Sequence, residues 1–161
     1  MDKSKRIAYS GIAAALTIIS LYLGLISVKG KITFLSLSSY ILAIPIIVSN
    51  IYTGLLVALA SDILAFYLIP NKVYVLVFIP MSFYPSVKAY LESRIKFNWV
   101  FKYIYFNLSI IAVYNVYKFF ISKDIVIGYY YLFLIAAQLF FYIYDVVFTK
   151  FIGWVINKLG L

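Results

Sequence analysis

The sequence has 161 residues, of which 66% are hydrophobic and 12% charged, and its mean hydropathy is +1.04. Soluble domains are nearer to half apolar and a quarter charged, so this composition excludes an ordinary soluble globular domain. The absence of cysteine and histidine excludes disulfides, thiolate nucleophiles and the commonest metal ligand. The net charge of +9 comes from basic residues at the ends of apolar stretches, which indicates oriented membrane spans rather than a nucleic-acid surface.

The apolar stretches are long enough to cross a bilayer six times, at about 20 residues per helical span. The first stretch follows a basic start like that of a signal peptide, but its apolar length and the lack of a small-residue cleavage pattern predict a retained helix. The predicted spans are residues 7–28, two spans within 32–70 with a turn in the polar cluster at 49–54, then 73–91, 99–121 and 125–156. We therefore predict an all-α integral membrane bundle of six transmembrane helices, forming a single domain over residues 1–161.

The distribution of lysine and arginine predicts the orientation of these spans. With the amino terminus in the cytoplasm, nine basic residues lie on the inner side and five on the outer side. The positive-inside rule favours that arrangement. We expect a multi-pass protein of the cell membrane with both termini in the cytoplasm.

Two prolines, Pro80 and Pro85, lie inside the predicted span 73–91. Membrane helices tolerate proline where neighbouring helices or serine hydroxyls satisfy the carbonyl groups that proline frees. We expect this span to remain helical with such compensation.

The sequence offers few groups for catalysis. It has neither a G-x-x-x-x-G-K-[ST] phosphate loop nor a G-x-G-x-x-G motif, so any pumping would need a partner that hydrolyses ATP. Inside the spans lie two acids, Asp62 and Asp145, which are functional candidates because buried charge is costly in a membrane. Either acid could instead cap a helix or pair with a base such as Lys150. We predict no enzyme activity, no cofactor and no metal site.

Other polar and small residues give further candidates. Asn115 and Gln138 lie well inside spans and could join helices or bind a ligand. The 17 tyrosines and 14 phenylalanines suit interfacial belts, and some could stack on a planar ligand. In the first span, Ala8, Gly11 and Ala15 form a small-residue stripe that admits close approach of another helix, either within the bundle or between subunits.

The order of these features resembles a known family. The segments that carry the resemblance are KRIAYSGIAAALTIISLYLG, VKGKITFLSLSSY, AIPIIVSNIYTGLLVALASDILAFYLIPN and VVFTKFIGWVINKLGL. They are similar to the substrate-binding S components of energy-coupling factor (ECF) vitamin importers, especially folate-transporter-like members. The matching positions are Pro45, Gly54, Ala58, Ser61, Asp62 and Pro70. Leu55 stands where the family usually has proline, Pro80 and Pro85 stand in a helix that is usually glycine-rich, and the amino-terminal histidines of the metal importers are missing.

The resemblance implies a substrate-capture subunit of an ABC-type importer for a vitamin or similar small molecule. The loop from Lys29 to Ser38 would close over the ligand, and a transmembrane coupling subunit with ABC ATPases would supply the energy. The implied subunit interface is Ala8, Gly11 and Ala15. The implied substrate-binding residues are Tyr40, Asp62, Tyr84, Asn115 and Gln138.

Two alternatives remain from the sequence. The chain is also similar in size, aromatic content and span number to the rod-shape scaffold proteins of cell-wall elongation, which do not transport. A proton-coupled carrier that uses Asp62 or Asp145 is the third possibility.

Overall fold

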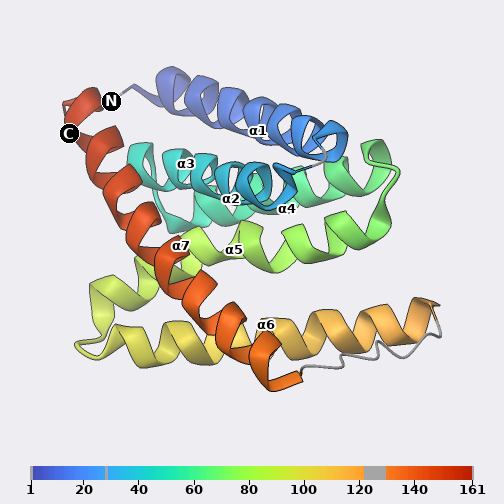
Figure 1. The fold of residues 1–161 in the computed structure, drawn as a ribbon. Coiled ribbons are helices and arrows are strands. Elements are labelled where there is room, and N and C mark those ends of the chain that lie inside the picture. Colours follow the sequence, from blue (N-terminus) through green and yellow to red (C-terminus); the bar gives the residue numbers. More distant parts are fainter. Residues whose placement is uncertain (1, 28, 122–129, 161) are drawn as a thin grey trace. The chain divides into compact units, whose positions relative to one another are not determined.

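The computed structural model describes residues 2–27, 29–121 and 130–160, and the ordered elements among these residues are all helices (Figure 1). The helices are α1 (Lys3–Ile26), α2 (Lys31–Ile41), α3 (Ala43–Val48), α4 (Ile51–Leu68), α5 (Lys72–Arg94), α6 (Asn98–Ile121) and α7 (Tyr130–Leu159). Five stretches in the described residues are long and apolar enough to span a membrane, with α2 and α3 forming one of them. The all-α membrane fold predicted from the sequence is confirmed.

The remaining predicted span, 99–121, corresponds to α6. This helix has 24 residues, the same length as α1, and it is not among the five stretches found in the described residues. The start of the last predicted span, residues 125–129, lies outside the described residues, and α7 continues to Leu159.

The chain divides into two compact units, Met1–Lys102 and Tyr103–Leu161. Unit 1 contains α1 to α5, and unit 2 contains α6 from Tyr103 onward and α7. The single domain expected from the sequence stays a prediction.

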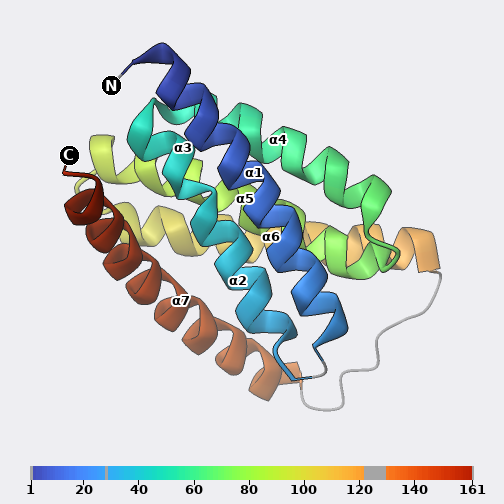
Figure 2. The same cartoon turned by 90° about the horizontal axis from the view of Figure 1, so that it is seen from above.

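Unit 1 is built from four helical rods, because α2 and α3 follow one another along a single direction (Figure 2). The first rod, α1, packs against the α2–α3 rod and against α4, and α5 packs against α4 and the α2–α3 rod. The side chains of the apolar core are Leu21, Leu35, Leu42, Ala58, Ala65, Ile69, Val75 and Phe78.

The break between α2 and α3 falls at Leu42, three residues before Pro45. Proline is accepted in the first turn of a helix because the amide hydrogens there have no intrahelical acceptor. This explains why α3 restarts immediately before Pro45. The prediction of a loop from Lys29 to Ser38 is wrong for most of these residues, because α2 begins at Lys31.

The two prolines of α5 do not interrupt that helix, as the sequence predicted. Pro85 lacks the amide hydrogen that would bond to the carbonyl of Met81, four residues earlier. The hydroxyl of Ser39, from α2, donates to this Met81 carbonyl. A serine from a neighbouring helix therefore provides the compensation expected in a membrane helix.

Asparagine side chains fix the starts of two helices. Asn50 accepts a hydrogen bond from the Thr53 amide (2.8 Å) at the start of α4, and Asn71 accepts one from the Tyr74 amide (3.1 Å) at the start of α5. Both satisfy an amide hydrogen that has no partner within its own helix. The predicted turn therefore narrows to Ser49 and Asn50, with Thr53 already in α4.

In unit 2, aromatic rings and one amide pair join the two helices. The Phe141 ring of α7 stacks on Phe106 at 4.4 Å between ring centres and meets Tyr103 edge-on at 5.1 Å. The Gln138 amide nitrogen donates to the Asn107 side-chain oxygen at 2.8 Å. These residues link the first half of α6 with the first half of α7.

Candidate functional site

The buried face of α4 carries the polar residues with the strongest functional signal. Its buried residues are Gly54, Ala58, Ser61, Asp62 and Ala65. Their spacing of three, four or one residue places them on one side of the helix. Five of the six positions on which the family resemblance rests are buried, all except Pro70.

Small residues let α4 pack closely in this region. A Cβ atom added at Gly54 would lie 2.2 Å from Cγ1 of Ile46 and 3.3 Å from the hydroxyl oxygen of Ser86. Glycine is therefore required there by the approach of α3. The face of α4 that contains Gly54 also contacts α5.

Four polar side chains are buried on these two helices: Ser61 and Asp62 of α4, and Ser82 and Ser86 of α5. We call this group the α4–α5 polar seam. Asp62 is 8% exposed, and the other three residues are 3% exposed or less. A carboxyl group in such a position is expensive in a membrane protein and is a functional candidate by default.

Asp62 has little hydrogen bonding for a buried carboxyl group. Its Oδ2 atom interacts with the Ser82 hydroxyl at 2.9 Å, and the same hydroxyl also lies 2.7 Å from the Ile79 carbonyl oxygen. A serine hydroxyl carries one proton, so it can donate to only one of these two acceptors at a time. The second carboxyl oxygen, Oδ1, is buried with no hydrogen-bond partner.

The hydroxyl groups of Ser61 and Ser86 are also buried without a hydrogen-bond partner. Buried polar atoms are nearly always hydrogen-bonded in folded proteins, so three such atoms in one seam call for an explanation. Each is a hydrogen-bonding atom that the protein's own contacts leave unused. Among the described residues no cluster of three or more acids, cysteines or histidines could hold a metal ion.

The predicted aromatic residues of the site are both in unit 1. Tyr40, in α2, is 8% exposed and Tyr84, in α5, is 2% exposed. Tyr84 follows Ser82 by two residues, which is about 200° around a helix. It therefore lies on a different side of α5 from the polar seam.

The two predicted amides belong to unit 2 and have different surroundings. Gln138 makes the interhelical bond to Asn107, as the helix-joining interpretation expected. Asn115 is exposed, and its amide donates to the Ile111 carbonyl of its own helix at 2.8 Å. Of the five predicted binding residues, the structure therefore assigns three to unit 1 and two to unit 2, and only Asp62 belongs to the polar seam.

The predicted interface residues Ala8, Gly11 and Ala15 are all exposed on α1. No heavy atom lies within 4 Å of a Cβ added at Gly11. The opposite side of α1 is buried and is also rich in small residues, with Leu21 as the large one; the small residues are Ser10, Ala13, Thr17, Ser20 and Gly24. Hydroxyls of this buried side donate to α2, from Thr17 to the Ser38 carbonyl (3.4 Å) and from Ser20 to the Phe34 carbonyl (3.1 Å).

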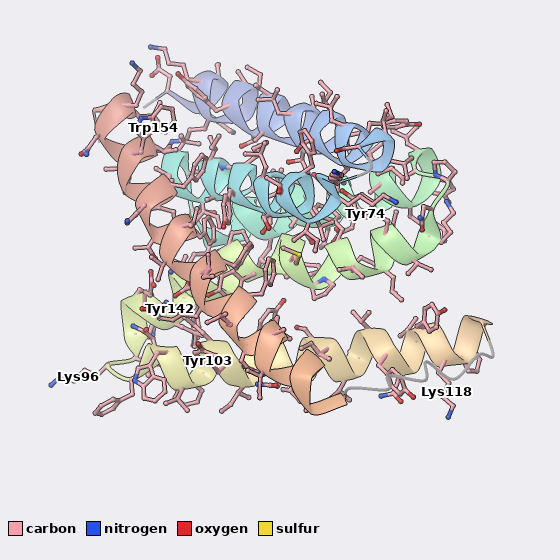
Figure 3. The ribbon with its side chains drawn as sticks, viewed as in Figure 1. Tyr74, Lys96, Tyr103, Lys118, Tyr142 and Trp154 are labelled. Carbon is pink, nitrogen blue, oxygen red and sulfur yellow. The ribbon has the colours of Figure 1, made fainter. Side chains whose placement is uncertain are left out.

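Gly24 shows how closely the buried side of α1 is packed. An added Cβ atom would lie 2.2 Å from the Tyr74 hydroxyl oxygen and 2.8 Å from Cβ of Phe34. The Tyr74 side chain reaches from α5 to the junction of α1 and α2, where its hydroxyl donates to the Lys31 carbonyl (Figure 3).

Sequence reasoning missed an ion cluster at the end of α5. Lys88 lies 2.7 Å from the Glu92 carboxylate, and Lys102 binds the same oxygen atom. Both lysines are buried, at 1% and 5% exposure. The spacing of four residues between Lys88 and Glu92 was the available signal, since such pairs are neighbours on a helix.

No protein-family model matches the sequence, and no curated protein or solved structure matches it either.

Proposed function

We propose that this protein is the membrane substrate-capture subunit of an ECF-type importer for a vitamin or a similar small molecule. In this proposal it resides in the cell membrane with both termini in the cytoplasm. A transmembrane coupling subunit and ABC ATPases supply the energy, and the chain itself catalyses no reaction.

The observation that carries the proposal is the exposed stripe of Ala8, Gly11 and Ala15. Small residues at such spacing let a second helix approach closely in a membrane. The internal contacts of α1 use its other side, from Ser10 to Gly24, so the exposed stripe is available to another chain.

The α4–α5 polar seam supports the capture part of the proposal. Asp62 Oδ1 and the hydroxyls of Ser61 and Ser86 are unused by the protein's own hydrogen bonds. Ligand sites combine an apolar surround with a few such polar groups. Among the predicted binding residues, Asp62 has the strongest support for a role in substrate binding. The expected closing loop over Lys29–Ser38 does not support the proposal, because most of it is helical.

The test separates coupling from capture. Gly11→Leu is expected to abolish uptake in cells that carry the coupling subunit and ATPases, because the new side chain blocks the partner helix. Ligand affinity of the purified variant in detergent should stay unchanged. Gly153→Leu is the matched control, since Gly153 is an exposed helical glycine that also has no heavy atom within 4 Å of an added Cβ.

Equal uptake by the Gly11→Leu variant and the wild type would contradict a coupling role for this stripe. Identification of small molecules that co-purify with the wild-type protein, by mass spectrometry, tests the capture role directly. A scaffold of the rod-shape type would carry no such molecule, and its loss would alter cell shape instead of vitamin uptake.

A further inference from the structure

A groove of about 850 Å³ runs along the outside of unit 1, between the first half of α1 and the chain from Ser49 to Ala60. These two segments start at the same end of the unit and run in the same direction (Figure 2). The groove contains none of the five predicted substrate-binding residues. It is therefore a second feature of the unit, separate from the polar seam.

One end of the groove is basic and polar. Lys3 and Arg6, both exposed, line it from α1, and the hydroxyls of Ser49 and Thr53, 3.0 Å apart, line it from the other side. Ser10 lies beside them, 8% exposed, and its buried hydroxyl has no hydrogen-bond partner. This end offers two positive charges and the hydroxyls of Ser49 and Thr53.

The other end of the groove is apolar. It is lined by Gly11 and Ala14 of α1 and by Val57 and Ala60 of α4. Their small side chains leave room beside the helices, and Gly11 has no neighbour within 4 Å of an added Cβ. From Lys3 to Ala14 the groove rises about 16 Å, at about 1.5 Å per residue. That is about half of the hydrocarbon thickness of about 30 Å, or one leaflet.

We propose that this groove binds an anionic phospholipid. The phosphate group lies against Lys3 and Arg6, and one acyl chain follows Ala14, Val57 and Ala60. Basic side chains at the end of a membrane span attract anionic headgroups. The change from charged to hydroxyl to apolar lining along the groove matches the order of groups in such a lipid.

The proposal is tested on the full chain in detergent by native mass spectrometry, with phosphatidylglycerol and phosphatidylcholine of identical acyl chains. We expect about a thirtyfold preference for phosphatidylglycerol, from about 1 kcal/mol for each of Lys3 and Arg6. Arg6→Gln should lower the phosphatidylglycerol affinity about fivefold and leave phosphatidylcholine unchanged. Lys5→Gln is the matched control, because Lys5 is an exposed neighbour that does not line the groove.

A second pair of variants tests the apolar end. Ala60→Phe fills the groove and should weaken binding of both lipids, whereas Leu59→Phe, at an exposed position outside the groove, should not. Equal effects of Arg6→Gln and Lys5→Gln, or no lipid preference in the wild type, would overturn the proposal. Competition by sn-glycerol 3-phosphate at equal concentration would overturn it too, since the site would then serve a soluble anion. None of the four variants changes Ala8, Gly11 or Ala15, although Gly11 lines the groove as well.

Discussion

The two sides of α1 are both rich in small residues, yet they have opposite surroundings. The side with Gly24 is buried against α2 and α5, where Phe34 and Tyr74 occupy the space a side chain would need. The side with Gly11 is exposed and meets no atom within 4 Å of an added Cβ. Small residues in a membrane helix therefore mark close packing without saying whether the partner belongs to the same chain.

The largest change in stability should come from adding a methyl group to the buried side of α1. Gly24→Ala is expected to lower the free energy of unfolding by about 1–3 kcal/mol, the range for overpacked cores. The new Cβ would stand 2.8 Å from Cβ of Phe34, which cannot rotate away as the end of a side chain can. Unfolding of the purified protein by titration with SDS in mixed micelles measures this loss.

Gly11→Ala is the matched change on the exposed side. Its stability should stay within about 1 kcal/mol of the wild type, the size of the helix-propensity difference between glycine and alanine. Equal losses of stability in Gly24→Ala and Gly11→Ala would show that both sides of α1 pack inside the protein. That result would contradict the difference between the two sides.

A substitution in the α4–α5 polar seam should instead increase the stability of the protein, by a smaller amount. Asp62→Asn keeps an acceptor for Ser82 and removes a carboxyl group that has one oxygen without a partner. Because buried charge is disfavoured in a membrane, the variant should be more stable by about 1 kcal/mol, while ligand capture is lost. SDS titration and ligand retention in detergent measure the two outcomes.

Ser82→Ala serves as the contrast for that experiment. It removes the hydroxyl that interacts with Asp62 and should destabilise the protein by about 1–3 kcal/mol, because a buried polar group loses its partner. A marked loss of stability in Asp62→Asn as well would identify Asp62 as part of the packing, like Gly24, and not as a ligand-binding group.

The fold could be predicted from the sequence because membrane spans are a matter of length and apolarity. The compensation for Pro85 was also predictable in kind, since the freed carbonyl had to find a donor. That the donor is Ser39 could not be predicted, because it depends on how α2 packs on α5. The helical start of α2 at Lys31 agrees with the apolar stretch predicted from residue 32, and the error lies in the loop to Ser38 that the family resemblance implied.

The candidate site was less predictable than the fold. Burial of Asp62 followed from its place in an apolar stretch, but the polar partners on α5, Ser82 and Ser86, depend on the register between two helices. The exposure of Ala8, Gly11 and Ala15 could not be predicted either, because Ala13 and Gly24 are equally small and lie on the buried side. Composition alone does not distinguish the two sides.

The smallest change in stability is expected from the amide side chains of unit 2. Gln138 forms a hydrogen bond to another helix, whereas Asn115 forms one within its own helix. A double-mutant cycle of Gln138→Leu and Asn107→Leu should give a coupling energy of about 0.6 kcal/mol, the average for interhelical hydrogen bonds in a membrane protein. Asn115→Leu should change stability by less, since its amide donates to the Ile111 carbonyl of its own helix. A cycle with no coupling, measured by SDS titration, would mean that α6 and α7 are held together by Phe141 and its ring contacts and that the amide pair adds nothing.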